Sequence, residues 1–184
     1  MRELSIIGLS GSLRTPSRTT ALMIEVLGKI AARRGAPAQL IELAGVAEAL
    51  AAARAGGPTT IQVRAVIEAV EGADFLVLGA PVYRASVTTV ARDLFELIRP
   101  DALRGVPVIP VAIGGEGARA LIPEAAFRPL AGLALATLVA PGVHAAAEDF
   151  DGTRLVGADI PSRIDRAVAR LDAVAPGARE PARA

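Results

Sequence analysis

A strand–loop–helix unit occupies residues 4–30, which read LSIIGLSGSLRTPSRTTALMIEVLGKI. Residues 4–10 form a short apolar run, typical of a strand buried on both faces. Residues 19–32 then carry apolar side chains at helical spacing, with charged residues between them: Leu22, Val26, Leu27 and Ile30. A buried strand followed by an amphipathic helix is the repeating unit of parallel α/β sheets.

The same alternation continues along the chain. Further strands are predicted at residues 38–43, 74–81, 106–115 and 136–143, and helices at 61–70, 88–98 and 160–174. A short helix is predicted before Pro58, and the helix after the fourth strand is punctuated by Pro123 and Pro129. Strands separated by helices require a parallel sheet covered on both faces, so we expect a doubly wound three-layer α/β sandwich.

Composition limits the possible partners. The 184 residues include 20 Lys and Arg against 19 Asp and Glu, a net charge of +1 that argues against binding to nucleic acid or to an anionic membrane. Cysteine is absent, which excludes disulfides and thiolate chemistry and suits a reducing compartment, so we expect a cytoplasmic protein. The uncharged stretch 131–147 contains Thr137, Pro141 and His144 and falls short of a membrane span.

The chain length suits one domain, predicted to extend over residues 1–175. Residues 176–184 have no apolar periodicity, and we expect them to be a disordered tail.

Parallel sheets of this kind bind ligands beyond the carboxyl ends of their strands, so the loops after strands one, three and four matter most. The first loop, 10–20, is rich in hydroxyls, carries Arg14 and leads into a helix, a combination that suits a phosphate dianion. It matches neither the dinucleotide nor the nucleoside-triphosphate glycine pattern. The alternative is that Ser17 is only an N-cap and the other hydroxyls are solvated.

The other two loops contain an aromatic side chain and a cluster of glycines. Residues 80–89 contain Tyr83, the only tyrosine, which can either pack on a ligand or cover the sheet edge. Residues 112–119 contain Gly114, Gly115 and Gly117, which allow the backbone to approach a ligand closely, although a glycine-rich turn alone is weak evidence.

Together these segments resemble the NADPH-dependent FMN reductase family. The resemblance is carried by GSLRTPSRTTAL (11–22), PVYRAS (81–86), GG (114–115), FRPL (127–130) and LVAPGVHA (138–145). It is nearest to the reductases that supply reduced flavin to alkanesulfonate monooxygenases. The resemblance implies a flavodoxin-like fold with a five-stranded parallel sheet of order 2-1-3-4-5, FMN, NADPH or NADH as co-substrate, a homodimer or homotetramer, and a flavin-dependent monooxygenase as a partner.

The resemblance also implies which residues bind FMN. The family's phosphate loop corresponds to Ser10, Ser12, Arg14, Ser17 and Thr19. Its isoalloxazine loop corresponds to Pro81, Val82, Tyr83, Arg84, Ala85 and Ser86, and its third loop to Gly114 and Gly115.

The sequence departs from the family at three places. The segment 86–92 lacks the usual glycine and has Arg92 where relatives have lysine, and Arg119 replaces a frequent histidine. Ala125 stands where the desulfonation-linked relatives have an aromatic residue, and Pro123 is expected to interrupt that helix. From these two residues we expect FMN to be held as a prosthetic group.

The helix at 88–98 is interpreted as an interface between subunits rather than only a cover of the sheet, because one face of it carries Val90, Leu94 and Leu97. His144 is expected to be structural, and Glu124 and Asp149 to be solvated.

The chemistry asked of the protein is modest, because hydride passes between the nicotinamide and flavin rings themselves. The sequence therefore predicts an NAD(P)H-dependent FMN reductase with no catalytic side chain and no metal. Two alternatives stay open. One is a quinone, azo or chromate reductase with bound FMN, and the other is a non-catalytic FMN-binding module.

Overall fold

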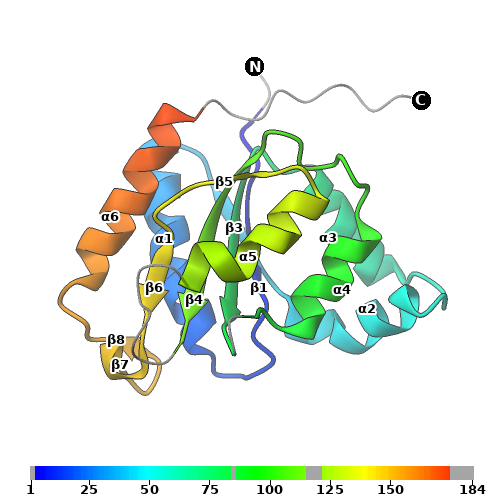
Figure 1. Ribbon diagram of the computed structural model, residues 1–184, viewed down its shortest axis with the longest axis horizontal. Coiled ribbons are helices and arrows are strands. Elements are labelled where there is room, and N and C mark those ends of the chain that lie inside the picture. The colour runs from blue at the N-terminus through cyan, green and yellow to red at the C-terminus, as the bar shows by residue number, and fades with distance from the viewer. Residues whose placement is uncertain (1–2, 84–85, 115–121, 175–184) are drawn as a thin grey trace.

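The structure is a computed structural model that describes residues 3–83, 86–114 and 122–174, without the side chain of Ile122. A parallel sheet runs through the middle of the molecule and helices cover both of its faces (Figure 1). The strand order is β2-β1-β3-β4-β5, and a further short strand, β6, also pairs with β4. The predicted three-layer fold and strand order are confirmed. The predicted tail, 176–184, lies outside the described residues.

The strands are β1 (Ile6–Ser10), β2 (Ala38–Glu42), β3 (Phe75–Pro81), β4 (Pro107–Ile113), β5 (Thr137–Leu138), β6 (Val143–Ala145), β7 (Phe150–Asp151) and β8 (Arg154–Leu155). The helices are α1 (Arg18–Arg34), α2 (Ala47–Arg54), α3 (Ile61–Glu71), α4 (Thr89–Leu97), α5 (Ile122–Leu133) and α6 (Ile160–Arg170). Short 3-10 turns occupy Leu43–Val46, Ala147–Asp149 and Leu171–Ala173.

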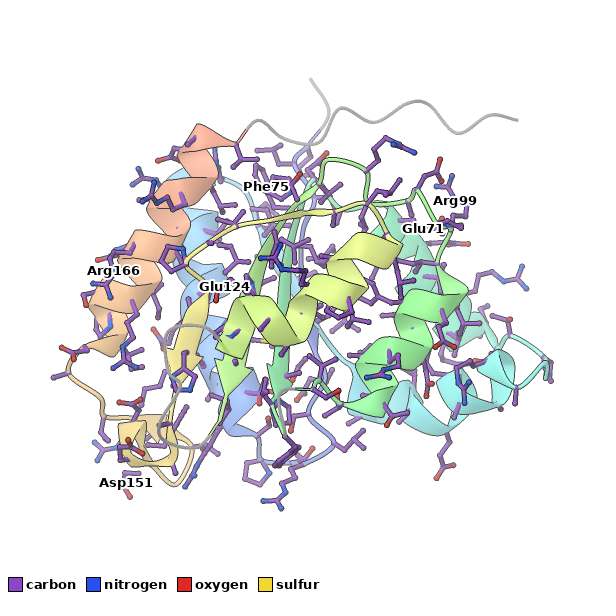
Figure 2. All side chains as sticks on the ribbon, viewed as in Figure 1. Glu71, Phe75, Arg99, Glu124, Asp151 and Arg166 are labelled. Atoms are coloured by element: carbon purple, nitrogen blue, oxygen red, sulfur yellow. The ribbon has the colours of Figure 1, made fainter. Side chains whose placement is uncertain are left out.

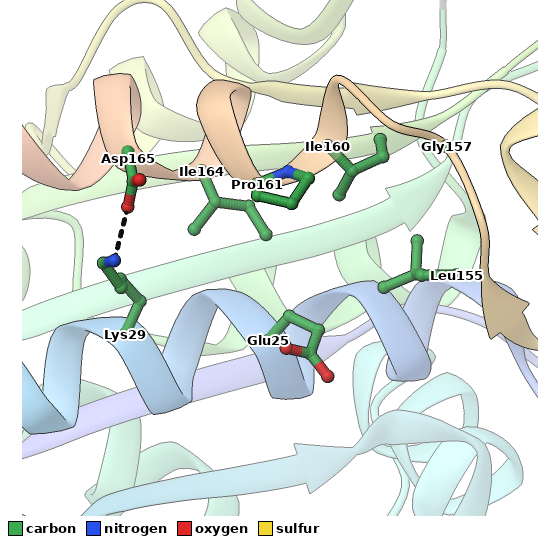
Figure 3. Close-up of a pocket in the computed structure, with 8 residues that line it drawn as sticks. All are labelled: Glu25, Lys29, Leu155, Gly157, Ile160, Pro161, Ile164 and Asp165. Carbon is green, nitrogen blue, oxygen red and sulfur yellow. Dashed lines mark ion pairs between the residues drawn. The ribbon is translucent and has the colours of Figure 1, made fainter.

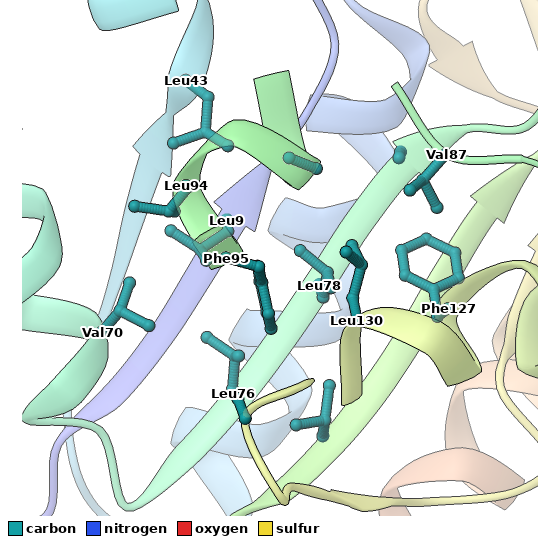
Figure 4. Packing of buried hydrophobic residues seen from close by; sticks show 14 of the residues in the cluster. Leu9, Leu43, Val70, Leu76, Leu78, Val87, Leu94, Phe95, Phe127 and Leu130 are labelled. Atoms are coloured by element: carbon teal, nitrogen blue, oxygen red, sulfur yellow. The ribbon is translucent and has the colours of Figure 1, made fainter. Parts of the chain in front are cut away.

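Two apolar cores form because alternate residues of a strand point to opposite faces of the sheet. One core packs the sheet against α2, α3, α4 and α5 (Figure 4), and its strand residues include Ile7, Leu9, Leu76, Leu78 and Val108. The other packs the sheet against α1 and α6, and its strand residues include Ile6, Phe75, Val77, Ile109 and Val111. Outside this core, Arg99, just after α4, forms an ion pair with Glu71 at the end of α3 (Figure 2).

The predicted fifth strand, 136–143, is divided in the structure. Residues 137–138 and 143–145 pair with β4 as two short strands, and the chain leaves the sheet between them. Pro141 has no N–H to donate to the sheet. Gly142 packs so closely on β4 that a Cβ there would lie 2.6 Å from the carbonyl oxygen of Pro110.

The expectation that Glu124 and Asp149 are solvated was wrong. Glu124 accepts a hydrogen bond at 2.5 Å from the N–H of Gly142, a backbone group that the break leaves without a sheet partner. Asp149 is 14% exposed and accepts from the N–H of Ala146 at 2.9 Å. Both carboxylates therefore hold the chain around β6, in which His144 is buried as expected.

Pro123 does not interrupt α5. It is the second residue of this helix, in the first turn, where a backbone N–H has no partner within the helix. Pro129 is the proline inside the helix. The reason for linking Pro123 to the retention of FMN is therefore removed, and only the small size of Ala125 remains.

The apolar face of α4 belongs to the core of the subunit. Val90 is 4% exposed and Leu94 is 0% exposed in the single chain, and Leu97 is partly buried against the same core. This face is therefore covered by the chain's own sheet and helices and gives no support to a subunit interface, and a part for α4 in such an interface stays a prediction.

Candidate functional site

A cleft of about 710 Å³ opens at the carboxyl edge of the sheet, a size typical of small-molecule sites. Four parts of the chain meet there: the loop after β1 with the start of α1, the end of β3 with the approach to α4, the end of β4, and the β7–β8 hairpin. The described residues that line it are Ser12, Leu13, Arg14, Pro16, Ser17, Arg18, Thr19, Pro81, Tyr83, Thr88, Ile113, Gly152 and Thr153.

The loop after β1 presents hydroxyls and backbone at the start of a helix. Ser17 is the N-cap of α1, and its Oγ accepts from the N–H of Thr20 at 3.2 Å. The Oγ of Ser12 accepts from the N–H of Arg14 at 3.2 Å, which folds the loop back on itself. Ser17 thus caps the helix and also lines the cleft, where the positive end of the helix dipole favours an anion. Binding of a phosphate by Ser17 stays a prediction.

The charges of the lining also favour an anion. Among the described lining residues Arg14 and Arg18 are basic and none is acidic.

The carboxyl group of Asp172 has a shifted pKa, but it lies away from the cleft. The hydrogen bond from Arg33 lowers the pKa of Asp172, and this pair lies at the opposite end of α1 from the cleft. That shift therefore concerns packing between α1 and the segment after α6.

Tyr83 follows β3 and forms an isolated antiparallel bridge with Ser86. The N–H of Tyr83 donates to the carbonyl of Ser86 at 3.0 Å, and the N–H of Ser86 donates back at the same distance. The side chain of Tyr83 lines the cleft and is 63% exposed, so a ligand can reach its ring. An exposed aromatic side chain beside an apolar wall of Pro81 and Ile113 suits a flat heterocycle.

The two loops are joined through Gly11. Its N–H donates to the carbonyl of Gly79 at 2.7 Å, and its own carbonyl accepts from the Oγ1 of Thr88 at 2.8 Å. Because Thr88 lies just before α4, this bond fixes the polar loop relative to the bridge of Tyr83 with Ser86.

The substitution Thr88→Val, which keeps the shape but removes the hydroxyl, is expected to lower the free energy of unfolding by about 1 kcal/mol and, if the cleft takes the FMN that the sequence resemblance implies, to weaken its binding several-fold. Urea unfolding and a flavin titration measure the two effects. Thr89→Val, at the next and exposed position, is the matched control. Equal behaviour of the two variants would show that the Thr88 bond does not hold the loops together.

Six of the predicted site residues lie together in the cleft: Ser12, Arg14, Ser17, Thr19, Pro81 and Tyr83. Four others lie outside its described lining: Ser10, Val82, Ser86 and Gly114. Arg84, Ala85 and Gly115 are outside the described residues.

Residues outside the lining have other partners. Ser10 is fully buried and its Oγ lies 2.9 Å from Thr20 Oγ1, beneath the loop. Ser86 lines a separate groove between α4 and α5, where its Oγ accepts from Arg92 at 3.0 Å. Arg92 is thus engaged with Ser86.

The sequence did not identify the hairpin wall of the cleft, formed by Gly152 and Thr153, or the contributions of Thr88 and Ile113. Arg18 was also missed, although it directly follows the predicted phosphate-loop residue Ser17. The signal that could have identified Arg18 is its position, as a basic residue in the first turn of the helix that follows the predicted phosphate loop.

A second hollow, of about 390 Å³, lies between α1 and α6 (Figure 3). Its floor is apolar, from Leu155, Ile160 and Ile164, and an ion pair of 2.6 Å between Lys29 and Asp165 closes one side. Both charged side chains are about half exposed. We interpret this hollow as the seam along which α6 packs on α1.

The doubly wound parallel sheet with its ligand cleft at the carboxyl edge defines a flavodoxin-like protein. Residues 4–151 match the NADPH-dependent FMN reductase family. The chain belongs to that family, and it is an oxidoreductase that uses FMN with NADH or NADPH as electron donor.

Relatives match over nearly the whole chain. The NADH-dependent FMN reductase SfnF of Pseudomonas putida is 35% identical over 92% of this chain and 90% of its own length. An FMN reductase (NADPH) of Pseudomonas aeruginosa is 33% identical over 90% of this chain and 89% of its own.

Solved structures show the same fold. An oxidoreductase from Corynebacterium diphtheriae superposes with a TM-score of 0.76 at 30% identity, covering 95% of this chain and 98% of that one. The apo form of an NADH:FMN oxidoreductase gives a TM-score of 0.79 at 24% identity, covering 92% and 89%, and supports the fold alone.

Proposed function

We propose that the chain binds FMN in the cleft at the carboxyl edge and that the nicotinamide cofactor reduces it there. The observation that carries this proposal is the meeting in one cleft of a hydroxyl-rich helix start, two arginines and an exposed tyrosine. The first two suit a phosphate dianion, and the third suits an aromatic ring system.

The residues of the chain bind the flavin and orient its ring. Ser12, Arg14 and Ser17 hold the phosphate, while Pro81 and Tyr83 flank the ring. FMN, when bound, supplies the ring that accepts the hydride. Because the transfer depends on stacking of two rings, the task of the protein is to fix one ring and leave its other face open to the nicotinamide.

Bleaching of the visible flavin absorption tests this function. Anaerobic addition of NADH or NADPH to the protein with FMN is expected to remove the oxidised flavin band in proportion to the nicotinamide added, and a comparison of the two donors gives the preference. Retention of the band by protein that binds FMN would support the non-catalytic module instead. Assays with quinone, azo dye and chromate then separate the alternative acceptors.

We propose that FMN stays bound as a prosthetic group. The support is Ala125, an exposed and small side chain on α5 at the position where the desulfonation-linked relatives have an aromatic residue. Yellow protein after purification and ping-pong kinetics are the expected results. Colourless protein that binds FMN only at micromolar concentration, with sequential kinetics, would contradict this proposal.

We also propose a homodimer or homotetramer in the cytoplasm that supplies reduced flavin to a monooxygenase. The resemblance to the alkanesulfonate-linked reductases supports the assembly and the partner, and the absence of cysteine from the sequence suits the compartment. None of the helices in the described part of the chain has the length and apolar content that crossing a membrane requires. Light scattering at micromolar concentration measures the assembly.

A further inference from the structure

The β7–β8 hairpin forms a wall of the flavin cleft that the loops after β1, β3 and β4 do not supply. Residues 150–155 fold back as a short antiparallel pair, and Gly152 and Thr153 at its turn line the cleft. Figure 2 places Asp151 of this hairpin at the carboxyl edge of the sheet, beyond the ends of β4 and β6. The hairpin therefore stands where the ligand is expected.

Arg18 fastens the turn of the hairpin to the start of α1. Its Nε donates to the carbonyl oxygen of Gly152 at 2.8 Å, and its guanidinium lies 5.5 Å from the centre of the Phe150 ring. A planar guanidinium can make both contacts at once because it donates in its plane and stacks on its face.

The base of the hairpin is fastened independently. The backbone carbonyl of Asp149 accepts from the N–H groups of Val156 and Gly157 at 2.9 and 3.1 Å. Arg163 of α6 donates to the carbonyl of His144 at 2.9 Å and lies 3.4 Å from the Asp149 carboxylate. With both ends held, the hairpin is a fixed wall rather than a loose loop.

This wall adjoins the phosphate end of the cleft, because Arg18 directly follows Ser17. We propose that the hairpin turn, held by Arg18, selects a flavin that ends in a monophosphate over FAD. FMN ends at its phosphate, whereas FAD continues from the same phosphate through a second phosphate to adenosine. The wall takes up space that this extension needs. The inference rests on the proposed function, since it assumes that the flavin phosphate lies at Ser17.

Arg18→Met tests the inference. FMN and FAD each carry about two negative charges, so losing the positive charge weakens both alike, and the ratio of their dissociation constants reports the wall. The wild-type protein is expected to prefer FMN at least about tenfold, and the variant to lose about tenfold of this preference. Quenching of flavin fluorescence measures both constants, and riboflavin serves as the ligand without phosphate.

Arg154→Met is the matched control. Arg154 lies on the same hairpin, its side chain is 75% exposed, and it pairs with the equally exposed Asp151 outside the cleft lining. This variant makes the same change of charge and is expected to keep the wild-type ratio. Phe150→Leu, which removes the ring beneath Arg18 and keeps an apolar side chain, replaces Arg18→Met if that variant fails to fold.

The outcomes separate the two proposals. An unchanged ratio in both Arg18→Met and Phe150→Leu, or wild-type protein that binds FAD as tightly as FMN, would overturn the role of the hairpin and leave the reductase function standing. Wild-type protein that binds none of the three flavins would overturn the proposed function and this inference with it.

Discussion

The substitution Ser17→Asp is expected to weaken FMN binding about a hundredfold and to change riboflavin binding little. Ser17 faces the cleft at the start of α1, where we place the phosphate dianion. A carboxylate there repels the dianion at close range, and the cleft screens this repulsion less than bulk water does. Riboflavin has the same ring and no phosphate, so the repulsion has nothing to act on.

The substitution is also expected to preserve the N-cap of α1. Ser17 caps α1 by accepting from the N–H of Thr20 at 3.2 Å, and aspartate is as good an N-cap as serine. Ser17→Asn is the matched control because it adds nearly the same volume and keeps a capping oxygen without the charge. The asparagine variant is expected to lose much less affinity for FMN than the aspartate variant does.

Titrations of the three proteins with FMN and riboflavin decide the result. If the aspartate variant lost both ligands equally, the phosphate would not lie at Ser17, and the loop after β1 would have to act on another part of the flavin.

The central strands and the long helices could be predicted from the sequence because each one presents a clear period over enough residues. The strands β1, β3 and β4 are continuous, mainly apolar runs of 5, 7 and 7 residues, and α1 repeats its apolar face over 17 residues. The hairpin could not be predicted, because β7 and β8 have two residues each and show no period. Its anchor joins residues 134 positions apart, Arg18 and Gly152, which no local pattern reveals.

The candidate site was predicted in part for a related reason. Polar loops at the ends of parallel strands mark the edge where a ligand binds, but not which side chains turn toward it. The extended backbone at the end of β3 shows this, because Pro81 and Tyr83 face the cleft while Val82 between them is 8% exposed. The two-residue period of a strand contains that information. Applied to residues 81–83, it predicts that the side chain of Val82 points away from the side on which Pro81 and Tyr83 lie.

The expectation for α4 depends on a different kind of pattern. An amphipathic helix must bury its apolar face, but the sequence does not state whether the cover is the chain's own sheet or another subunit. In the structure Leu94 is fully buried within the cluster that also contains Leu9 and Phe95 (Figure 4). The amphipathic pattern thus predicted burial correctly, and within the single chain the cover is the chain's own sheet and helices.

Leu94→Ala is therefore expected to lower the free energy of unfolding of the subunit by about 3 kcal/mol, through lost burial and the cavity that remains. Leu133→Ala, on α5, is the control: Leu133 is 53% exposed and its truncation is expected to cost less than about 1 kcal/mol. Urea unfolding gives both values.

The mass of Leu94→Ala in solution completes this test. A core residue stabilises the subunit itself, so the variant is expected to keep the wild-type oligomeric state at concentrations where it is folded. A residue at an interface would instead make apparent stability depend on protein concentration, because assembly follows mass action. A Leu94→Ala protein with the wild-type unfolding free energy and a smaller assembly would therefore show that Leu94 packs at a subunit interface instead.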